Sequence, residues 1–244
     1  MISLTSTKNI GNKELLSGST LKLIALISML IDHAAVAILY YGLLYPNRPI
    51  SVGSRLYQLY LLYQIMRKIG RIAFPIFCFL LVEGFLYTSN RKKYALRLFL
   101  FCLISEIPFD LALRQSFFEF THQNVFFTLF IGFIVLWGLE YFQNKPYLQA
   151  LTVAAGMGLA WLLKTDYDYK GIVLIVVLYL FHLTPALMTL SGCVSLLWEA
   201  PAMLAFIPIN LYNHKRGFSA KYFFYLFYPG HLFILWLIRK YLLL

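Results

Sequence analysis

Two ionisable residues, Asp32 and His33, interrupt an apolar run that extends from Leu21 to Tyr45. The only other formal charge in this run is Lys22, at its start. A charged group at the centre of a membrane helix costs about 2.5–3.5 kcal/mol on insertion scales, so such groups persist mainly where function or a partner compensates for them. A histidine can also take up and release a proton near neutral pH. The pair is therefore the first candidate for acid–base chemistry.

Helical spacing limits what this pair can contact. Lys22 and His33 are separated by about three helical turns and so share one face of the helix. Asp32 is rotated by about 100° from His33, so we expect its partner on another helix. The alternative role is structural: Asp32 would hold two helices together through a Lys or Arg, and His33 would be a core histidine with satisfied hydrogen bonds.

Further ionisable residues lie in other apolar runs. Arg71 precedes Pro75 and Glu83, and its planar guanidinium suits a phosphate, although it would equally suit the lipid headgroups at the end of a helix. A helix kinked by proline frees backbone carbonyls and lets polar groups reach a cavity. His231 is the second histidine at membrane depth.

The run from residue 94 to 113 holds three more charges. Glu106 and Asp110 lie four positions apart and share a face, so a cation or a proton must separate their charges. Arg97 lies about two and a half turns before Glu106 and points to the opposite side, which makes it a poor partner within the helix. The alternative role for each carboxylate is to neutralise an arginine of another helix.

Sequence motifs for a bound metal or nucleotide are missing. The chain has no phosphate-binding loop, no dinucleotide fingerprint, no zinc-protease motif and no serine-hydrolase motif. The three cysteines lie in apolar runs without CxxC spacing, so they are interpreted as core residues. We predict no metal site.

Composition sets the class of protein that must position these residues. Of 244 residues, 61% are hydrophobic and 13% are charged, against about 25% charged in soluble domains. The mean hydropathy is +0.72. These values predict an all-α, polytopic membrane protein with a single domain over 1–244, whose first 20 residues are polar and lack the apolar core of a signal peptide. The net charge of +11 is attributed to lipid headgroups and anionic ligands, so no nucleic-acid partner is predicted.

The apolar runs predict a helix bundle of about eight spans with kinked helices. A further helix over 55–69, rich in tyrosine and basic residues, is predicted to lie at the membrane interface. The positive-inside rule favours a cytoplasmic N-terminus and places residues 215–221 on the other face, but the two faces then carry nearly equal numbers of Lys and Arg. The predicted spans are 21–45, 71–87, 94–113, 124–142, 147–163, 172–182, 186–207 and 222–244.

Six stretches, in order along the chain, resemble the TraX family. They are LKLIALISMLIDH (21–33), RIAFPIFCFLLVEG (71–84), YALRLFLFCLISEIPFDL (94–111), NVFFTL (124–129), DYDYKG (166–171) and KYFFYLFYPGHL (221–232). The family's named member acetylates the N-terminal amine of a conjugative pilin at the bacterial inner membrane. The resemblance therefore implies a multi-pass acyltransferase of the cell membrane that uses acetyl-CoA and acts on a peptide, pilin or glycan acceptor.

The resemblance also implies roles for the residues above. His33 would be the general base, with its tautomer set by a carboxylate, either Asp32 or Glu106. Lys22, Arg71 and Arg97 would hold the phosphates of coenzyme A. His231 would carry a second proton or donate a hydrogen bond to the acyl carbonyl.

Two other functions fit the same residues. Intramembrane Asp, Glu and His are also typical of proton-coupled transporters and flippases, which would favour an inverted repeat that the sequence does not show. A non-enzymatic assembly factor for a surface structure would tolerate replacement of the ionisable residues.

Overall fold

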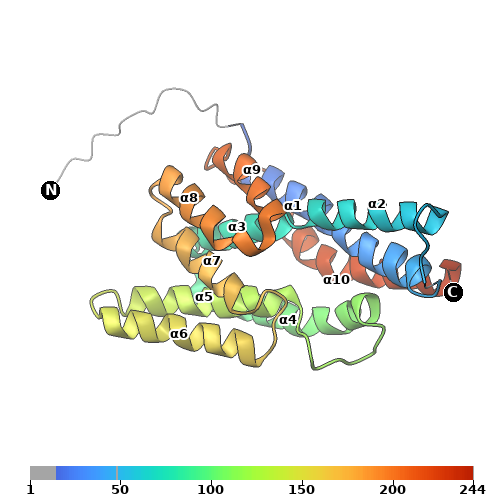
Figure 1. Ribbon diagram of the computed structural model, residues 1–244. Coiled ribbons are helices and arrows are strands. Elements are labelled where there is room, and N and C mark those ends of the chain that lie inside the picture. Colours follow the sequence, from blue (N-terminus) through green and yellow to red (C-terminus); the bar gives the residue numbers. More distant parts are fainter. Residues whose placement is uncertain (1–14, 48, 244) are drawn as a thin grey trace.

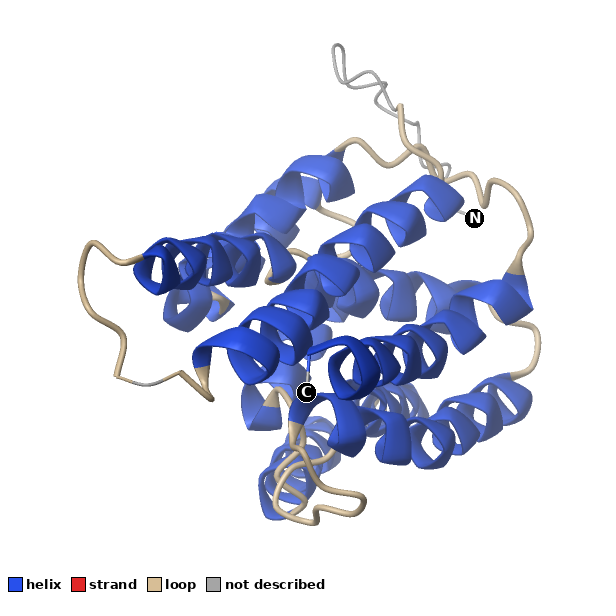
Figure 2. Ribbon diagram, turned by 90° about the vertical axis from the view of Figure 1, so that its right-hand side faces the viewer, coloured by secondary structure: helices blue, strands red, loops and turns tan. Residues whose placement is uncertain are grey.

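The computed structural model describes residues 15–47 and 49–243, and within these ranges the chain is helical, with two isolated β-bridges and no strand. Figures 1 and 2 show the helices gathered into one bundle. This confirms the predicted all-α fold. Of the polar segment predicted over 1–20, residues 1–14 lie outside the described residues.

The first long helix carries Asp32 and His33. It begins as α1 (Gly18–Ala34), where the Ser17 hydroxyl caps the helix by accepting from the Thr20 N–H at 3.3 Å, and continues as the π-helical η1 (Ala35–Leu44). Turns of π-helix are frequently found at functional sites, and this one begins two residues after His33. Together α1 and η1 form an apolar stretch of 27 residues, long enough to cross a membrane.

The second long stretch folds back along the first. Helices α2 (Arg55–Gly70) and α3 (Ala73–Tyr87) form 33 residues that also pass the length and hydropathy requirement for a span. The hydroxyl of Ser28 donates to the carbonyl of Ile69 at 2.7 Å, and Tyr40 stacks on Tyr63 at 5.5 Å, so α2 packs lengthwise and antiparallel to α1 and η1. Its predicted position at the membrane interface stays a prediction.

The break between α2 and α3 lies at Arg71 and Ile72 rather than at Pro75. Pro75 stands in the first turn of α3, where its missing N–H costs no helical hydrogen bond. The kink predicted from Pro75 is therefore a change of helix immediately before it, and Arg71 is placed at that change.

Two further helices run parallel to α1. They are α4 (Arg91–Leu113) and α10 (Lys221–Ile238). Phe101 of α4 stacks on Tyr225 of α10. Nearer the C-terminal ends of both helices, Arg239 donates to the carbonyls of Leu111 and Ala112 at 2.5 and 2.7 Å. Arg239 opens the short π-helical η3 (Arg239–Leu243). Helices α1, α4 and α10 therefore begin at the same end of the bundle.

Other helices cover only part of this length. Helix α5 (Val125–Tyr141) begins beside the middle of α4, where Asn124 donates to the Cys102 carbonyl at 2.8 Å, and it ends where Glu140 pairs with Arg91 at 2.8 Å. Helices α6 and α7 pack against α5 and against each other, and α8 packs against α7. The prediction that all of them cross the membrane, giving about eight spans, stays a prediction. Their bounds are Pro146–Leu162, Asp168–Leu180 and Pro185–Ser195.

The predicted span 186–207 is wrong as a single helix. The structure divides it into α8, the 3-10 helix η2 (Leu197–Ala205) and the short α9 (Phe206–Asn210). Glu199 has non-helical backbone angles (φ −141°, ψ 60°), and Pro201 follows it. Pro201 lacks an N–H, and in an α-helix its ring would clash with the carbonyl four residues earlier, that of Leu197, so α-helix cannot continue through this segment.

Residues 215–221 are not separated from the start of α1, as their predicted placement on the opposite face would require. The N–H of Gly18 donates to the Lys215 carbonyl at 2.8 Å, and the N–H of Ser19 donates to the Arg216 carbonyl at 3.0 Å. The loop before α10 therefore lies against the start of α1. The charge rule placed these segments on opposite faces because it assumed that every apolar run crosses the membrane.

Candidate active site

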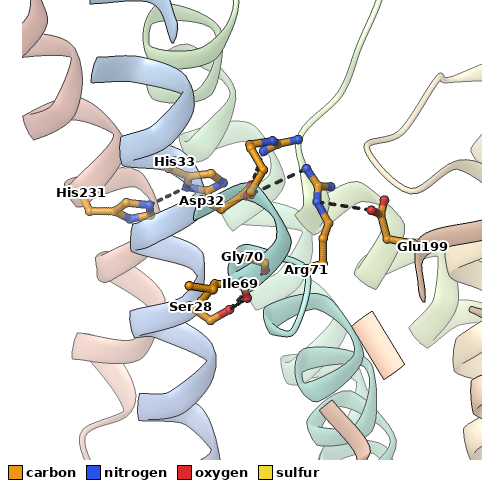
Figure 3. Close-up of polar contacts among 9 residues, drawn as sticks. Ser28, Asp32, His33, Ile69, Gly70, Arg71, Glu199 and His231 are labelled. Atoms are coloured by element: carbon orange, nitrogen blue, oxygen red, sulfur yellow. Dashed lines mark hydrogen bonds and ion pairs between the residues drawn. The ribbon is translucent and has the colours of Figure 1, made fainter. Parts of the chain in front are cut away.

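The imidazoles of His33 and His231 contact each other between α1 and α10. The Nδ1 atom of His33 lies 2.7 Å from the Nε2 atom of His231, and the two rings are parallel with centroids 5.0 Å apart (Figure 3). The residues are 198 positions apart in sequence. The two histidines that the sequence analysis selected therefore form one site.

The hydrogen bonds around His231 fix where the protons lie. The Nδ1 atom of His231 is 2.6 Å from the carbonyl oxygen of Phe227, which can only accept, so Nδ1 carries the proton. In the neutral ring Nε2 is then an acceptor, and the Nδ1–H of His33 must donate to it. The Nε2 atom of His33 is left with a free lone pair. This is the tautomer that a general base requires.

Aromatic rings enclose the histidine pair. Tyr228 meets both imidazoles edge-on, each at 5.8 Å between centroids, and Phe227 stacks on His231 at 4.9 Å. Tyr228 is 3% exposed and His231 is 6% exposed, whereas His33 is half-buried. His33 is therefore the more exposed member of the pair.

Asp32 does not pair with His33. Its carboxylate lies 2.5 Å from Nη1 of Arg67 and 3.7 Å from Nη2 of Arg71 (Figure 3). As predicted, its partner lies on another helix. The residue that sets the tautomer of His33 is His231 and not the predicted carboxylate, Asp32 or Glu106. The physical reason is the 100° rotation between adjacent helical residues, which turns Asp32 toward α2 while His33 faces α10.

A glycine makes room for this carboxylate. A Cβ atom added at Gly70 would collide with the side chain of Asp32. The hydroxyl of Ser28, one turn before Asp32, also donates to the backbone of α2 at Ile69. Sequence reasoning gave Arg67 no partner and Gly70 no role, because the register between α1 and α2 was unknown.

Arg71 lies between two carboxylates. Figure 3 shows it with Asp32 on one side and Glu199 on the other, and its Nε atom is 3.8 Å from Glu199 Oε1. Glu199 reaches this position because the chain leaves the helical conformation there. The kink at Glu199 within η2 and the change from α2 to α3 thus bring a carboxylate and a guanidinium to the same point.

Glu106 belongs to a different contact. Its carboxylate accepts from the backbone N–H of Asn124 at 3.3 Å and from the Asn124 side-chain amide. Asn124 in turn caps α5 by accepting from the Phe126 N–H at 3.0 Å. Within the described residues, Glu106 forms hydrogen bonds with Asn124 at the start of α5 and with neither histidine. Its predicted partnership with His33 is therefore wrong, because Asn124 holds its Oε2 atom at the start of α5.

The three cations predicted to hold phosphates are not gathered at one place. Lys22 lies over the Phe224 ring at 5.1 Å, and Arg97 lies over the Tyr94 ring at 5.5 Å. The prediction that the three hold one ligand is therefore wrong, because Lys22 lies about three turns and about 16 Å along the helix from His33, whereas Arg71 lies beside Asp32. No three His, Cys, Asp or Glu side chains within the described ranges are grouped to hold a metal.

Comparison with known proteins identifies the family. Residues 17–239 match the family described as "TraX protein". The chain is also 28% identical, over 266 aligned positions, to a "Probable fimbrial assembly protein FimC, serogroup H1" from Dichelobacter nodosus, and the alignment covers 90% of this chain and 94% of that protein. No solved structure matches. The match contains Asp32, His33, Arg71, Glu199 and His231, and the chain belongs to the TraX family of membrane proteins.

Proposed function

We propose that this protein is a membrane-embedded acyltransferase that moves an acetyl group from acetyl-CoA to an amine or hydroxyl, with His33 as the general base. The observation that carries the proposal is the hydrogen-bond chain from His33 through His231 to the Phe227 carbonyl. It holds His33 in the tautomer whose outer nitrogen accepts a proton. Membership in the TraX family and similarity to a fimbrial assembly protein favour the N-terminal amine of a pilin subunit as the acceptor.

The proposed reaction needs one proton acceptor and one proton donor. The acceptor nitrogen attacks the carbonyl carbon of the thioester while Nε2 of His33 removes its proton. The resulting imidazolium is stabilised because its Nδ1–H already donates to His231. When the carbon–sulfur bond breaks, the sulfur takes the proton back from Nε2, so the products are the acetylated acceptor and the free thiol.

His33→Asn tests the proposal directly. The asparagine amide can replace the Nδ1–H that donates to His231, but it provides no base at the position of Nε2. Purified protein in detergent, incubated with labelled acetyl-CoA and a peptide bearing a pilin N-terminus, should lose about 10²- to 10⁴-fold in rate. Its thermal unfolding should change little. Transfer at the rate of the unmodified protein would contradict the assignment of His33 as the base.

The histidine pair also favours a second function. Two imidazoles joined by a hydrogen bond between α1 and α10 are a proton path, as a proton-coupled transporter would need. Reconstitution into liposomes separates the two functions. Proton-coupled flux without any acyl donor would support transport, and transfer of the labelled acetyl group in detergent, where no gradient exists, would support the acyltransferase.

A further inference from the structure

A cavity of about 490 Å³ opens beside the ion pairs of Asp32. One wall is the second half of α2 with the residue that follows it, and the other is the start of η2 around Glu199. Along α2 the lining extends over about 12 Å, from Tyr63 to Arg71. The side chains that matter for the argument are Gln64, Arg67, Lys68, Arg71, Trp198 and Glu199.

The charges that line this cavity are unbalanced. The lining holds three cations, Arg67, Lys68 and Arg71, and one carboxylate, Glu199. Asp32 and Asp166 interact with Arg71 from outside this lining. Asp32 binds Arg67 closely, and Lys68 is exposed and has no ion pair among the described residues. A cavity with excess positive charge at one wall attracts an anion.

Arg71 has donors to spare. Its distances to Asp32 and Glu199 are 3.7 and 3.8 Å, and both are longer than a hydrogen bond. The guanidinium carries five N–H donors in a planar fork that matches two oxygens of a phosphate, and a lysine adds a point charge. Arg71 is therefore held in place by charge while its hydrogen-bonding positions remain available.

We propose that this cavity binds the phosphate or diphosphate group of a phosphate ester, with Arg71 and Lys68 as its principal ligands. Glu199 opposes the ligand, since a carboxylate beside Arg71 competes with an incoming anion. The identification of the ester with the acyl donor rests on the proposed function. A phospholipid headgroup carries the same chemistry, so the experiments below distinguish these sources.

Binding of inorganic pyrophosphate tests the site without any turnover. Titration calorimetry on His33→Asn protein in detergent should show binding, and Lys68→Gln should weaken it about tenfold, as expected for loss of one charge-assisted contact. Glu199→Gln should tighten binding several-fold because the competing charge is gone. Lys92→Gln, an exposed cation in the first turn of α4, is the matched control and should change nothing.

A second measurement identifies the source of the phosphate. In protein that keeps His33, and so remains active, Lys68→Gln should raise KM for acetyl-CoA. It should not raise KM for S-acetylpantetheine, which lacks phosphates. Competition of phosphatidylglycerol nanodiscs with pyrophosphate would instead assign the phosphate site to a lipid headgroup. If no donor supports transfer, the proposed function fails while pyrophosphate binding still decides this inference. Absence of pyrophosphate binding, or binding unchanged by both Lys68→Gln and Glu199→Gln, would overturn it.

Discussion

The proton positions at the histidine pair follow from one backbone carbonyl. Because the Phe227 carbonyl can only accept, the orientation of both imidazoles is determined outward from it. His231 then acts as a positioning residue for His33, since it does not need to touch the substrate. A hydrogen-bonded histidine behind a catalytic histidine fulfils the role more often taken by a carboxylate.

Two substitutions of His231 should separate positioning from packing. The side-chain carbonyl of glutamine in His231→Gln can accept the Nδ1–H of His33, so transfer should fall by less than tenfold. Phenylalanine in His231→Phe keeps the aromatic contacts with Phe227 but accepts nothing, and kcat should fall about 10²-fold or more with KM nearly unchanged. Steady-state kinetics with labelled acetyl-CoA checks this. Equal activity of the two variants would show that the hydrogen bond to His231 has no role in the reaction.

At the scale of elements, the contact between α1 and α2 places Asp32 against its arginine. Gly70 allows the two helices to approach there, because any Cβ atom would overlap the Asp32 side chain. Gly70→Ala should therefore push the carboxylate from Arg67 and destabilise the protein by about 1–3 kcal/mol. Gly158→Ala is the matched control: it lies in α6 with no atom within 4 Å of the added Cβ, and it should be neutral or stabilise by about 0.5–1 kcal/mol. Thermal unfolding in detergent compares them, and equal shifts would contradict the close approach.

The start of α5 depends on a second side-chain contact. Asn124 is fully buried and serves both as the cap of α5 and as the hydrogen-bond donor to Glu106. Asn124→Ala should cost about 1 kcal/mol for the cap and about 1–3 kcal/mol more because Glu106 loses the side-chain amide donor and keeps only the backbone N–H. Asn90→Ala removes only a solvent-exposed cap, that of α4, and should cost about 1 kcal/mol. Urea unfolding of the two variants measures the difference, and a loss at Asn124 no larger than at Asn90 would rule out a contribution from Glu106.

At the scale of the whole molecule, the sequence selected residues that the structure brings close together, but it did not predict which of them pair. Asp32, His33, Arg71 and His231 could be selected because ionisable groups in apolar runs are costly. Their pairing could not be predicted, since the register between helices far apart in sequence is set by packing. The segment 186–207 was also predicted as one span although Pro201 permits a broken helix, because its apolar length alone fits a membrane crossing.

The same packing predicts which ends of the helices share a side of the membrane. The backbone contacts of Gly18 and Ser19 with Lys215 and Arg216 hold the loop before α10 beside the start of α1, and α4 runs parallel to both. Single cysteines at Lys92 and Lys215 should therefore react with an impermeant maleimide from the same face, while a cysteine at the exposed Val52 should react from the other.

The labelling would be done in Cys193→Ser protein, whose other cysteines, Cys78 and Cys102, are buried. Intact and opened cells are compared, because a position that faces the cytoplasm reacts only after the cells are opened. If Lys215→Cys reacted together with Val52→Cys and apart from Lys92→Cys, the parallel arrangement of α4 and α10 would be wrong. The topology based on eight spans would then be restored, since it is the arrangement that places 48–71 and 215–221 on one face.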